Sequence, residues 1–125
     1  MTEIPSTLRQ DPDGLLTYEY IANHIGEISA DELDALIENM VIVDRSGQFL
    51  ASAARYLHAI NPEGFNPAVR RLVAATIDRD REHKYLSDLV LGLYGEDYAD
   101  RAEQLCASDD NFRRIYKRLF PTNAI

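Results

Sequence analysis

The stretch SADELDALIENMVIVDRSG, residues 29–47, decides between a helical and a mixed fold. Ser29 is followed three residues later by Glu32, a capping-box signature in which each side chain accepts a hydrogen bond from a backbone N–H that a helix start leaves unpaired. The apolar side chains that follow share one helical face: Leu33, Leu36, Ile37, Met40 and Val41. The pattern therefore predicts a helix that ends at the turn-forming residues 44–47.

The end of this stretch also supports a second interpretation. Residues 40–43 are rich in β-branched side chains, and residues 44–47 are typical of a turn. A short β-hairpin around residues 40–50, pairing 40–43 with 48–50, is the alternative to a helix at this place.

Apolar spacing predicts further helices on both sides of this stretch. Leu15 begins a helix that stops before Gly26, and a second one covers residues 50–60. Asn66 and Pro67 suit a helix start, and they predict one long helix over about 67–94. Its apolar stripe rotates across the polar residues 78–84, where a bend or break is expected.

The chain ends in two shorter helices, and it begins without one. Residues 98–106 predict a short helix, and residues 112–119 predict a last one, capped by Ser108 or Asp109. Residues 1–14 contain two prolines and a glycine, so we expect an extended lead-in. No repeat is apparent at the period of a solenoid. The prediction is an all-α fold, with residues 15–125 forming a single compact bundle of five or six helices.

Composition sets the class of protein. The chain has 125 residues, of which 46% are hydrophobic and 27% are charged, proportions typical of one globular domain. No apolar run approaches the roughly 20 residues that a membrane span needs, and no secretory signal begins the chain. The single cysteine, Cys106, lies on an apolar helix face. We therefore expect a cytoplasmic protein in which this thiol is buried and unreactive.

The net charge of −8 is uneven along the chain. Residues 1–47 hold ten acidic and two basic side chains, whereas residues 48–125 hold eleven of each. This layout disfavours binding to nucleic acid and favours pairing with another protein or with a second copy in a homodimer. The charged side chains of two helices form the candidate interaction surface: Asp31, Asp34, Glu38, Arg113, Arg114, Lys117 and Arg118.

Residues 20–33 carry a local resemblance to a DNA-binding pattern. The Ile-Ala pair at 21–22, the turn at Gly26 and the aliphatic side chains that follow resemble a helix-turn-helix. The resemblance implies a DNA-associated regulator. The helix that would read the DNA departs from the family, however, because it carries four acids and no basic residue, which would repel phosphates. We therefore interpret Gly26 as a packing corner between two helices.

A polar stripe on the predicted long helix is the second candidate site. Thr76, Asp80, His83 and Ser87 follow one another at helical spacing, and the Asp80–His83 pair has the chemistry of an oriented general base or of two metal ligands. No metal-binding motif such as His-Glu-x-x-His accompanies it, so we predict no metal and no cofactor. The favoured interpretation of this stripe is a solvated helix face with i,i+4 charge pairs.

The sequence thus favours a protein-interaction or regulatory module without catalytic activity. The alternatives are a helix-turn-helix-like regulator and an enzyme or metal-binding protein that uses the Asp80 and His83 face. No catalytic residue is identified, because phosphate-binding loops, nucleophile elbows and paired cysteine clusters are absent from the sequence.

Overall fold

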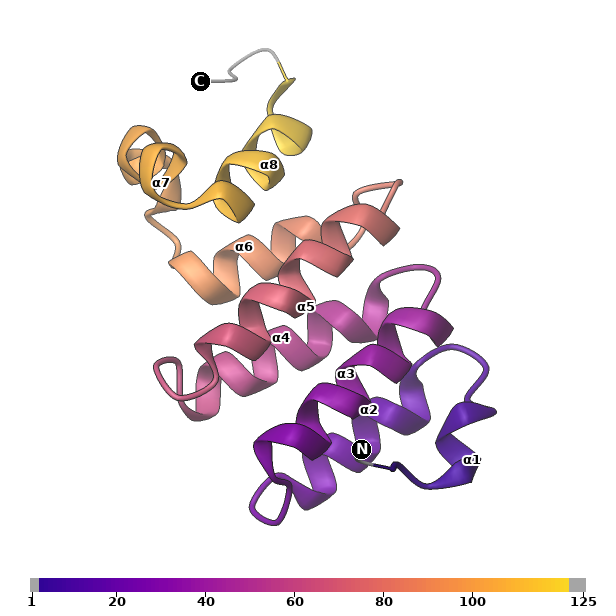
Figure 1. Ribbon diagram of the computed structural model, residues 1–125. Helices are drawn as coiled ribbons and strands as arrows, with labels where there is room; N and C mark the ends of the chain where they lie inside the picture. Colours follow the sequence, from indigo (N-terminus) through magenta and orange to yellow (C-terminus); the bar gives the residue numbers. More distant parts are fainter. Residues whose placement is uncertain (1–2, 122–125) are drawn as a thin grey trace.

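The computed structural model describes residues 3–121, which form eight α-helices, one 3₁₀ helix and no strand. Figure 1 shows the order of these elements along the chain. Their bounds are α1 Ser6–Arg9, α2 Leu15–His24, α3 Ala30–Val43, α4 Gln48–Ile60, α5 Asn66–Arg79, α6 Leu86–Tyr94, the 3₁₀ helix Tyr98–Arg101, α7 Ala102–Ser108 and α8 Asp110–Leu119. The predicted all-α class is confirmed, although the helices outnumber the five or six expected.

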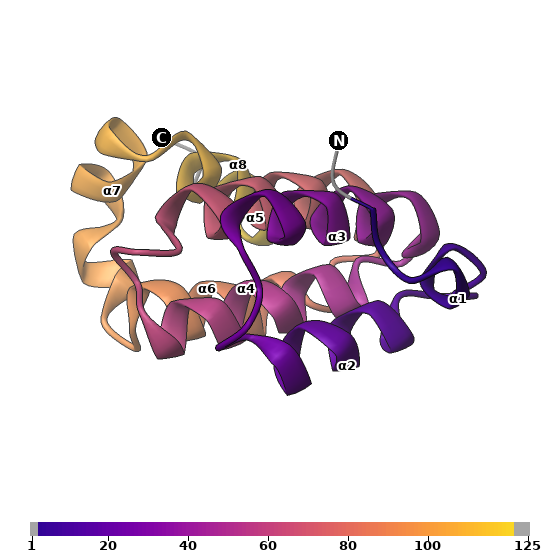
Figure 2. The same ribbon diagram turned by 60° about the horizontal axis from the view of Figure 1, so that its bottom comes forward.

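The chain passes back and forth between two layers of helices. Helices α3, α5 and α8 lie side by side in one layer, and α2, α4 and α6 lie side by side in the other (Figure 2). The most extensive contact joins the layers between α4 and α5, and α8 lies against both α5 and α6. The connections α1–α2, α3–α4 and α5–α6 therefore fall at one end of the molecule, and the connections α2–α3 and α4–α5 fall at the other.

The core fills the space between these layers. Its largest side chains have less than 2% of their surface exposed and come from six helices: Ile21, Leu36, Ile37, Met40, Leu50, Leu57, Leu72, Val73, Leu86, Leu89, Phe112 and Ile115. Fully burying one such side chain contributes about 1.5–3 kcal/mol, so the packing between layers supplies the main stabilisation.

The prediction of one long helix over 67–94 is wrong, and the break falls within the polar residues 78–84, where the sequence indicated a bend or break. Residues 67–94 form two helices in different layers, α5 and α6, separated by a turn at residues 80–85. The helix ends because the buried carboxylate of Asp80 accepts hydrogen bonds from the backbone N–H groups of Lys84, Tyr85 and Leu86, at 2.8, 2.7 and 3.1 Å. The rotated apolar stripe reflects this reversal, since each half faces the core from its own layer.

Two further expectations are corrected. Residues 40–43 belong to α3, and no hairpin forms with residues 48–50, because Met40 is wholly buried in the core and this packing outweighs β-propensity. The lead-in is not wholly extended, since residues 6–9 form α1, and Ile4 and Leu8 are buried in the core. The amide of Asn39 on α3 holds α1 in place by donating to the Leu8 carbonyl at 2.7 Å.

Two predicted helix caps are confirmed. The hydroxyl of Ser29 accepts from the backbone N–H of Glu32 at 3.1 Å and caps α3. Asp109, one of two expected caps for α8, accepts from the N–H of Phe112 at 3.1 Å. These local signals succeed because a capping contact involves only neighbours in the chain.

One device recurs at the end of the molecule where α1–α2, α3–α4 and α5–α6 connect. Asp11, Asp44 and Asp80 are 4%, 1% and 2% exposed, and each accepts several backbone N–H groups at the start of the helix that follows it. In every case one of these donors is the amide six residues further on. Charge-assisted bonds of this kind satisfy the helix start and compensate the cost of burying the carboxylate.

The three turns also stack on one another, and we call the set Asp11, Asp44 and Asp80 the aspartate ladder. A β-carbon added at Gly14 would lie 3.0 Å from Cβ of Asp44, and one added at Gly47 would lie 3.3 Å from Cβ of Asp80. Both glycines have positive φ, +106° and +90°, which favours glycine. The structure therefore corrects the expectation of no repeat: a helix–aspartate turn–helix unit occurs three times.

The third turn departs from the first two at one position. His83 lies three residues after Asp80, as Gly14 and Gly47 lie after their aspartates, and its φ of +58° is the only positive value at a non-glycine residue among residues 3–121. The turn is the last of the ladder, so no following turn packs against it. Space therefore permits a side chain where the earlier turns exclude one.

Candidate functional site

The structure disperses the polar stripe expected on the long helix. Thr76 is fully buried in α5 and donates its hydroxyl to the Leu72 carbonyl at 2.8 Å, while Asp80 caps α6. His83 is exposed in the turn, and Ser87 is exposed on α6. These four side chains do not converge. The buried carboxylate of Asp80 already accepts hydrogen bonds from backbone N–H groups. It therefore does not orient His83 as a general base.

The basic side of α8 is largely engaged within the chain. Arg113 pairs with Asp110, and Arg114 contacts Asp78 of α5 at 2.9 Å. Arg118 donates to the Arg114 carbonyl at 3.1 Å. Lys117 is exposed. This helix therefore offers less free positive charge than its sequence indicates.

The acidic side of α3 remains open to solvent. Asp31, Asp34 and Glu38 are exposed, and Arg71 of α5 lies 3.5 Å from the carboxylate of Glu38. Their charge would repel a phosphate backbone. The corner at Gly26 joins α2 to this acidic helix, and the corner serves to place the two helices against each other.

Cys106 lies where the sequence predicts. Its side chain belongs to the core cluster and is 8% exposed, and burial raises the pKa of the thiol despite the nearby charge of Arg113. A raised pKa leaves little thiolate at neutral pH, so the residue contributes to packing.

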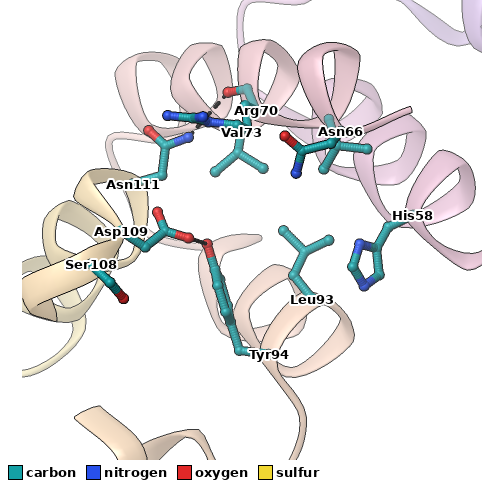
Figure 3. Close-up of a pocket in the computed structure, with 10 residues that line it drawn as sticks. His58, Asn66, Arg70, Val73, Leu93, Tyr94, Ser108, Asp109 and Asn111 are labelled. Carbon is teal, nitrogen blue, oxygen red and sulfur yellow. Dashed lines mark hydrogen bonds between the residues drawn. The ribbon is translucent and has the colours of Figure 1, made fainter. Parts of the chain in front are cut away.

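A polar cleft that the sequence does not predict lies between α4, α5, α6 and the start of α8. Figure 3 shows side chains of these helices around a common space, whereas the Ser108 hydroxyl points away from it and donates to the Gln104 carbonyl at 3.0 Å. The space has a volume of about 220 Å³. Its walls are polar: His58, Asn66, Arg70, Tyr94, Ser108, Asp109 and Asn111. Its remaining lining is apolar and consists of Val69, Val73 and Leu93, of which the two valines are buried. The cleft thus has the convergent polar groups and apolar surface typical of a binding site.

Two hydrogen bonds fix the start of α8, one against α6 and one against α5. The Tyr94 hydroxyl donates to Oδ2 of Asp109 at 2.7 Å, and the Asn111 amide donates to the Arg70 carbonyl at 3.1 Å (Figure 3). Burial raises the pKa of the Tyr94 phenol, and the hydrogen bond and negative charge of Asp109 raise it further. The phenol therefore stays protonated at neutral pH and acts as a hydrogen-bond donor.

The wall formed by α5 keeps its polar side chains free. Asn66 and Arg70 are exposed at the start of α5, and Arg70 has no ion pair within residues 3–121. Asp109 and Arg70 thus place a negative and a positive group around one small space. His58 closes the end of the cleft nearest α4 (Figure 3).

Size limits what the cleft can hold. Ligand sites for cofactors and drug-sized molecules have volumes of about 300–1,000 Å³, whereas this cleft has a volume of about 220 Å³. The space suits one or two side chains or a short length of extended backbone.

Comparison with known protein families, with curated proteins and with solved structures found no match to this chain. Within residues 3–121, no helix combines the length and the apolar character needed to span a membrane. The same part of the chain contains no group of three or more histidine, cysteine or acidic side chains arranged to hold a metal ion. The cleft is therefore assigned from its geometry alone.

Proposed function

We propose that this chain is a protein-interaction module that binds a short segment of a partner protein in the cleft between α4, α5, α6 and α8. The observation that carries the proposal is a small space lined by His58, Asn66 and Arg70, whose side chains have no hydrogen-bond partner within residues 3–121. Alternating helices in two layers present such surfaces on a rigid scaffold, as helical repeat proteins do.

The chemistry of the walls favours a peptide. Side-chain amides such as that of Asn66 offer one acceptor and two donors, which match the alternating groups of an extended backbone. Arg70 and Asp109 add one charge of each sign, and Val73 and Leu93 supply apolar contact for a side chain. The bound segment would therefore combine main-chain hydrogen bonds with one inserted side chain.

The same geometry gives less support to catalysis. Tyr94 is protonated and donates to Asp109, whose second oxygen accepts the N–H of Phe112. Neither group is free to activate a nucleophile. Binding is the function for which the cleft is best arranged.

Selection of peptides tests the proposal. Peptides from a random display library that bind the intact chain are titrated by NMR against the wild type and the variants Asn66→Ala and Arg70→Ala. These side chains are exposed, so truncation leaves the core intact. Each loss removes one hydrogen-bonding group, and we expect binding to weaken by roughly three- to tenfold.

Matched substitutions on the other layer provide the controls. Asn23 of α2 and Arg55 of α4 are exposed and lie outside the cleft. Asn23→Ala and Arg55→Ala should leave the affinity unchanged. Chemical-shift changes away from the cleft, or equal losses in control and cleft variants, would refute the proposed site.

A further inference from the structure

The outward face of α3 is acidic along its first three turns, and a basic residue follows in the turn after the helix. Four exposed residues of α3 lie at spacings of three or four and therefore share one side of the helix: Asp31, Asp34, Glu38 and Ile42. The first three are acidic, and Ile42 is the most exposed large hydrophobic residue described, at 69%. Arg45 comes after the helix end, beyond Asp44, whose backbone is extended with φ −89° and ψ 99°. We call the four helical residues and Arg45 the α3 face.

The basic end of the α3 face belongs to a wider cluster of arginines. Arg45 borders a surface hollow of about 500 Å³ together with Arg79 and Arg81 from the end of α5 and its following turn. These three arginines form no ion pair within residues 3–121. Acids nearby are engaged elsewhere, since Asp78 pairs with Arg114 and Glu82 pairs with Lys84.

We propose that the α3 face binds the α3 face of a second copy of this chain in an antiparallel, two-fold arrangement. Asp31 lies seven residues, or two helical turns, before Glu38, and Arg45 lies seven residues after Glu38 in the turn that follows α3. A two-fold axis near Glu38 therefore brings Asp31 of each copy to Arg45 of the other and Ile42 to the neighbourhood of Asp34. At the axis, the negative charge of each Glu38 is offset by Arg71 of the same chain, 3.5 Å from its carboxylate.

A second copy is the partner to which the pattern points. An interface with one sign of charge would require a partner of the opposite sign, whereas a face with opposite signs at its two ends is complementary to itself. This interface replaces the basic side of α8 as the partner of the acidic helix, because Arg113 and Arg114 are paired internally. It is separate from the cleft, which lies beyond α5.

Magnitudes define the conditions under which the dimer forms. Each copy carries a net charge of −8, which opposes association. At about 0.1 M salt the screening length is about 10 Å, so repulsion between molecular centres about 30 Å apart is suppressed while contacts at the interface persist. A single helix face is smaller than the roughly 800 Å² per partner of a stable complex, so the association is weak.

Complementary charge reversals test the arrangement by sedimentation equilibrium, in a concentration series reaching roughly 1 mM at about 0.1 M salt. Asp31→Arg and Arg45→Asp should each weaken self-association at least about tenfold, because each places like charges at both symmetric contacts. An equal mixture of the two variants should recover association to within about threefold of the wild type. In the mixed dimer both contacts are again of opposite sign.

Two controls carry the same change in net charge on the other layer. Glu19→Arg matches Asp31→Arg, and Arg55→Asp matches Arg45→Asp; both positions are exposed and lie outside the α3 face. Circular dichroism establishes that each variant is folded, and Ile42→Asn provides a variant that weakens the interface without altering charge. A wild-type monomer at every concentration, controls that weaken association as strongly, or a mixture without recovery would each overturn the proposal.

Discussion

Replacing Asp44 by asparagine should destabilise the fold by about 3 kcal/mol. One carboxylate oxygen accepts the N–H groups of Ser46 and Gly47 at 3.1 and 2.9 Å, and the other accepts those of Phe49 and Leu50, both at 2.9 Å. Asparagine keeps one acceptor oxygen and turns an NH₂ group toward the other pair of donors. Two charge-assisted bonds of about 1.5–3 kcal/mol each are lost, and access of water to the turn reduces the total.

The free energy of unfolding, measured by urea titration at pH 7 with circular dichroism, gives the answer. The control is Asp13→Asn, since Asp13 is exposed and accepts only the Leu15 N–H, at 3.0 Å, through an oxygen that asparagine also has. That control should change stability by less than about 0.5 kcal/mol. A loss below about 1 kcal/mol for Asp44→Asn, or one equal to the control, would refute the assignment of a structural role to the ladder.

Two further predictions concern the third turn and the cleft. His83→Gly should stabilise the chain by about 0.5 kcal/mol, because relief of the positive φ, about 1–2 kcal/mol, exceeds the added entropy of glycine in the unfolded chain. Gly47→Ala should destabilise the chain by about 2 kcal/mol, because Gly47 also has a positive φ and the added β-carbon would in addition press against Asp80. Thermal unfolding should therefore shift in opposite directions for the two variants. Tyr94→Phe should cost about 1 kcal/mol at pH 7 by removing the bond to Asp109. Because the pKa of Tyr94 is higher in the folded chain than its ordinary value of 10.0, the protonated phenol contributes its full stabilisation below pH 10. Above pH 10 the phenol ionises only in the unfolded chain, so the free energy of unfolding falls by up to about 1.4 kcal/mol per pH unit. Urea titrations between pH 8 and 11 should show a shallower decline for the variant, and parallel curves would contradict the assignment.

Local signals predicted most helices because they depend on neighbours in sequence. The caps at Ser29 and Asp109 and the apolar faces of α3 and α4 were all identifiable without tertiary information. The long helix was predicted wrongly for the opposite reason. Asp80 in a run of charged residues resembles a solvated surface, and its buried role becomes apparent only by comparison with Asp11 and Asp44.

The sequence alone shows only part of that comparison. Each aspartate is followed at the fifth position by a large apolar or aromatic residue: Leu16, Phe49 and Tyr85. The glycine at the third position marks the first two turns, but His83 replaces it in the last and hides the repeat. The aspartate and its fifth residue do not single out these turns, because the same spacing recurs from Asp13, Asp31, Asp88, Asp100 and Asp110 to a large apolar or aromatic residue.

The cleft could not be predicted in this way. Its lining is drawn from residues 58–111, which belong to several helices and to the connection between α7 and α8. His58 and Asp109, for example, are unremarkable until α8 is placed against α5 and α6. Only the arrangement of the layers brings them around one space.

The stacking of the aspartate ladder implies that the length of this protein is adjustable in evolution and in engineering. Residues 44–79 contain one turn and one helix from each layer, and each turn contacts its neighbour through the same glycine-to-aspartate fit. Tandem duplication of this segment would insert a unit whose two faces already match those around it. Growth would remain bounded by α8, which covers the last helix pair as a terminal cap.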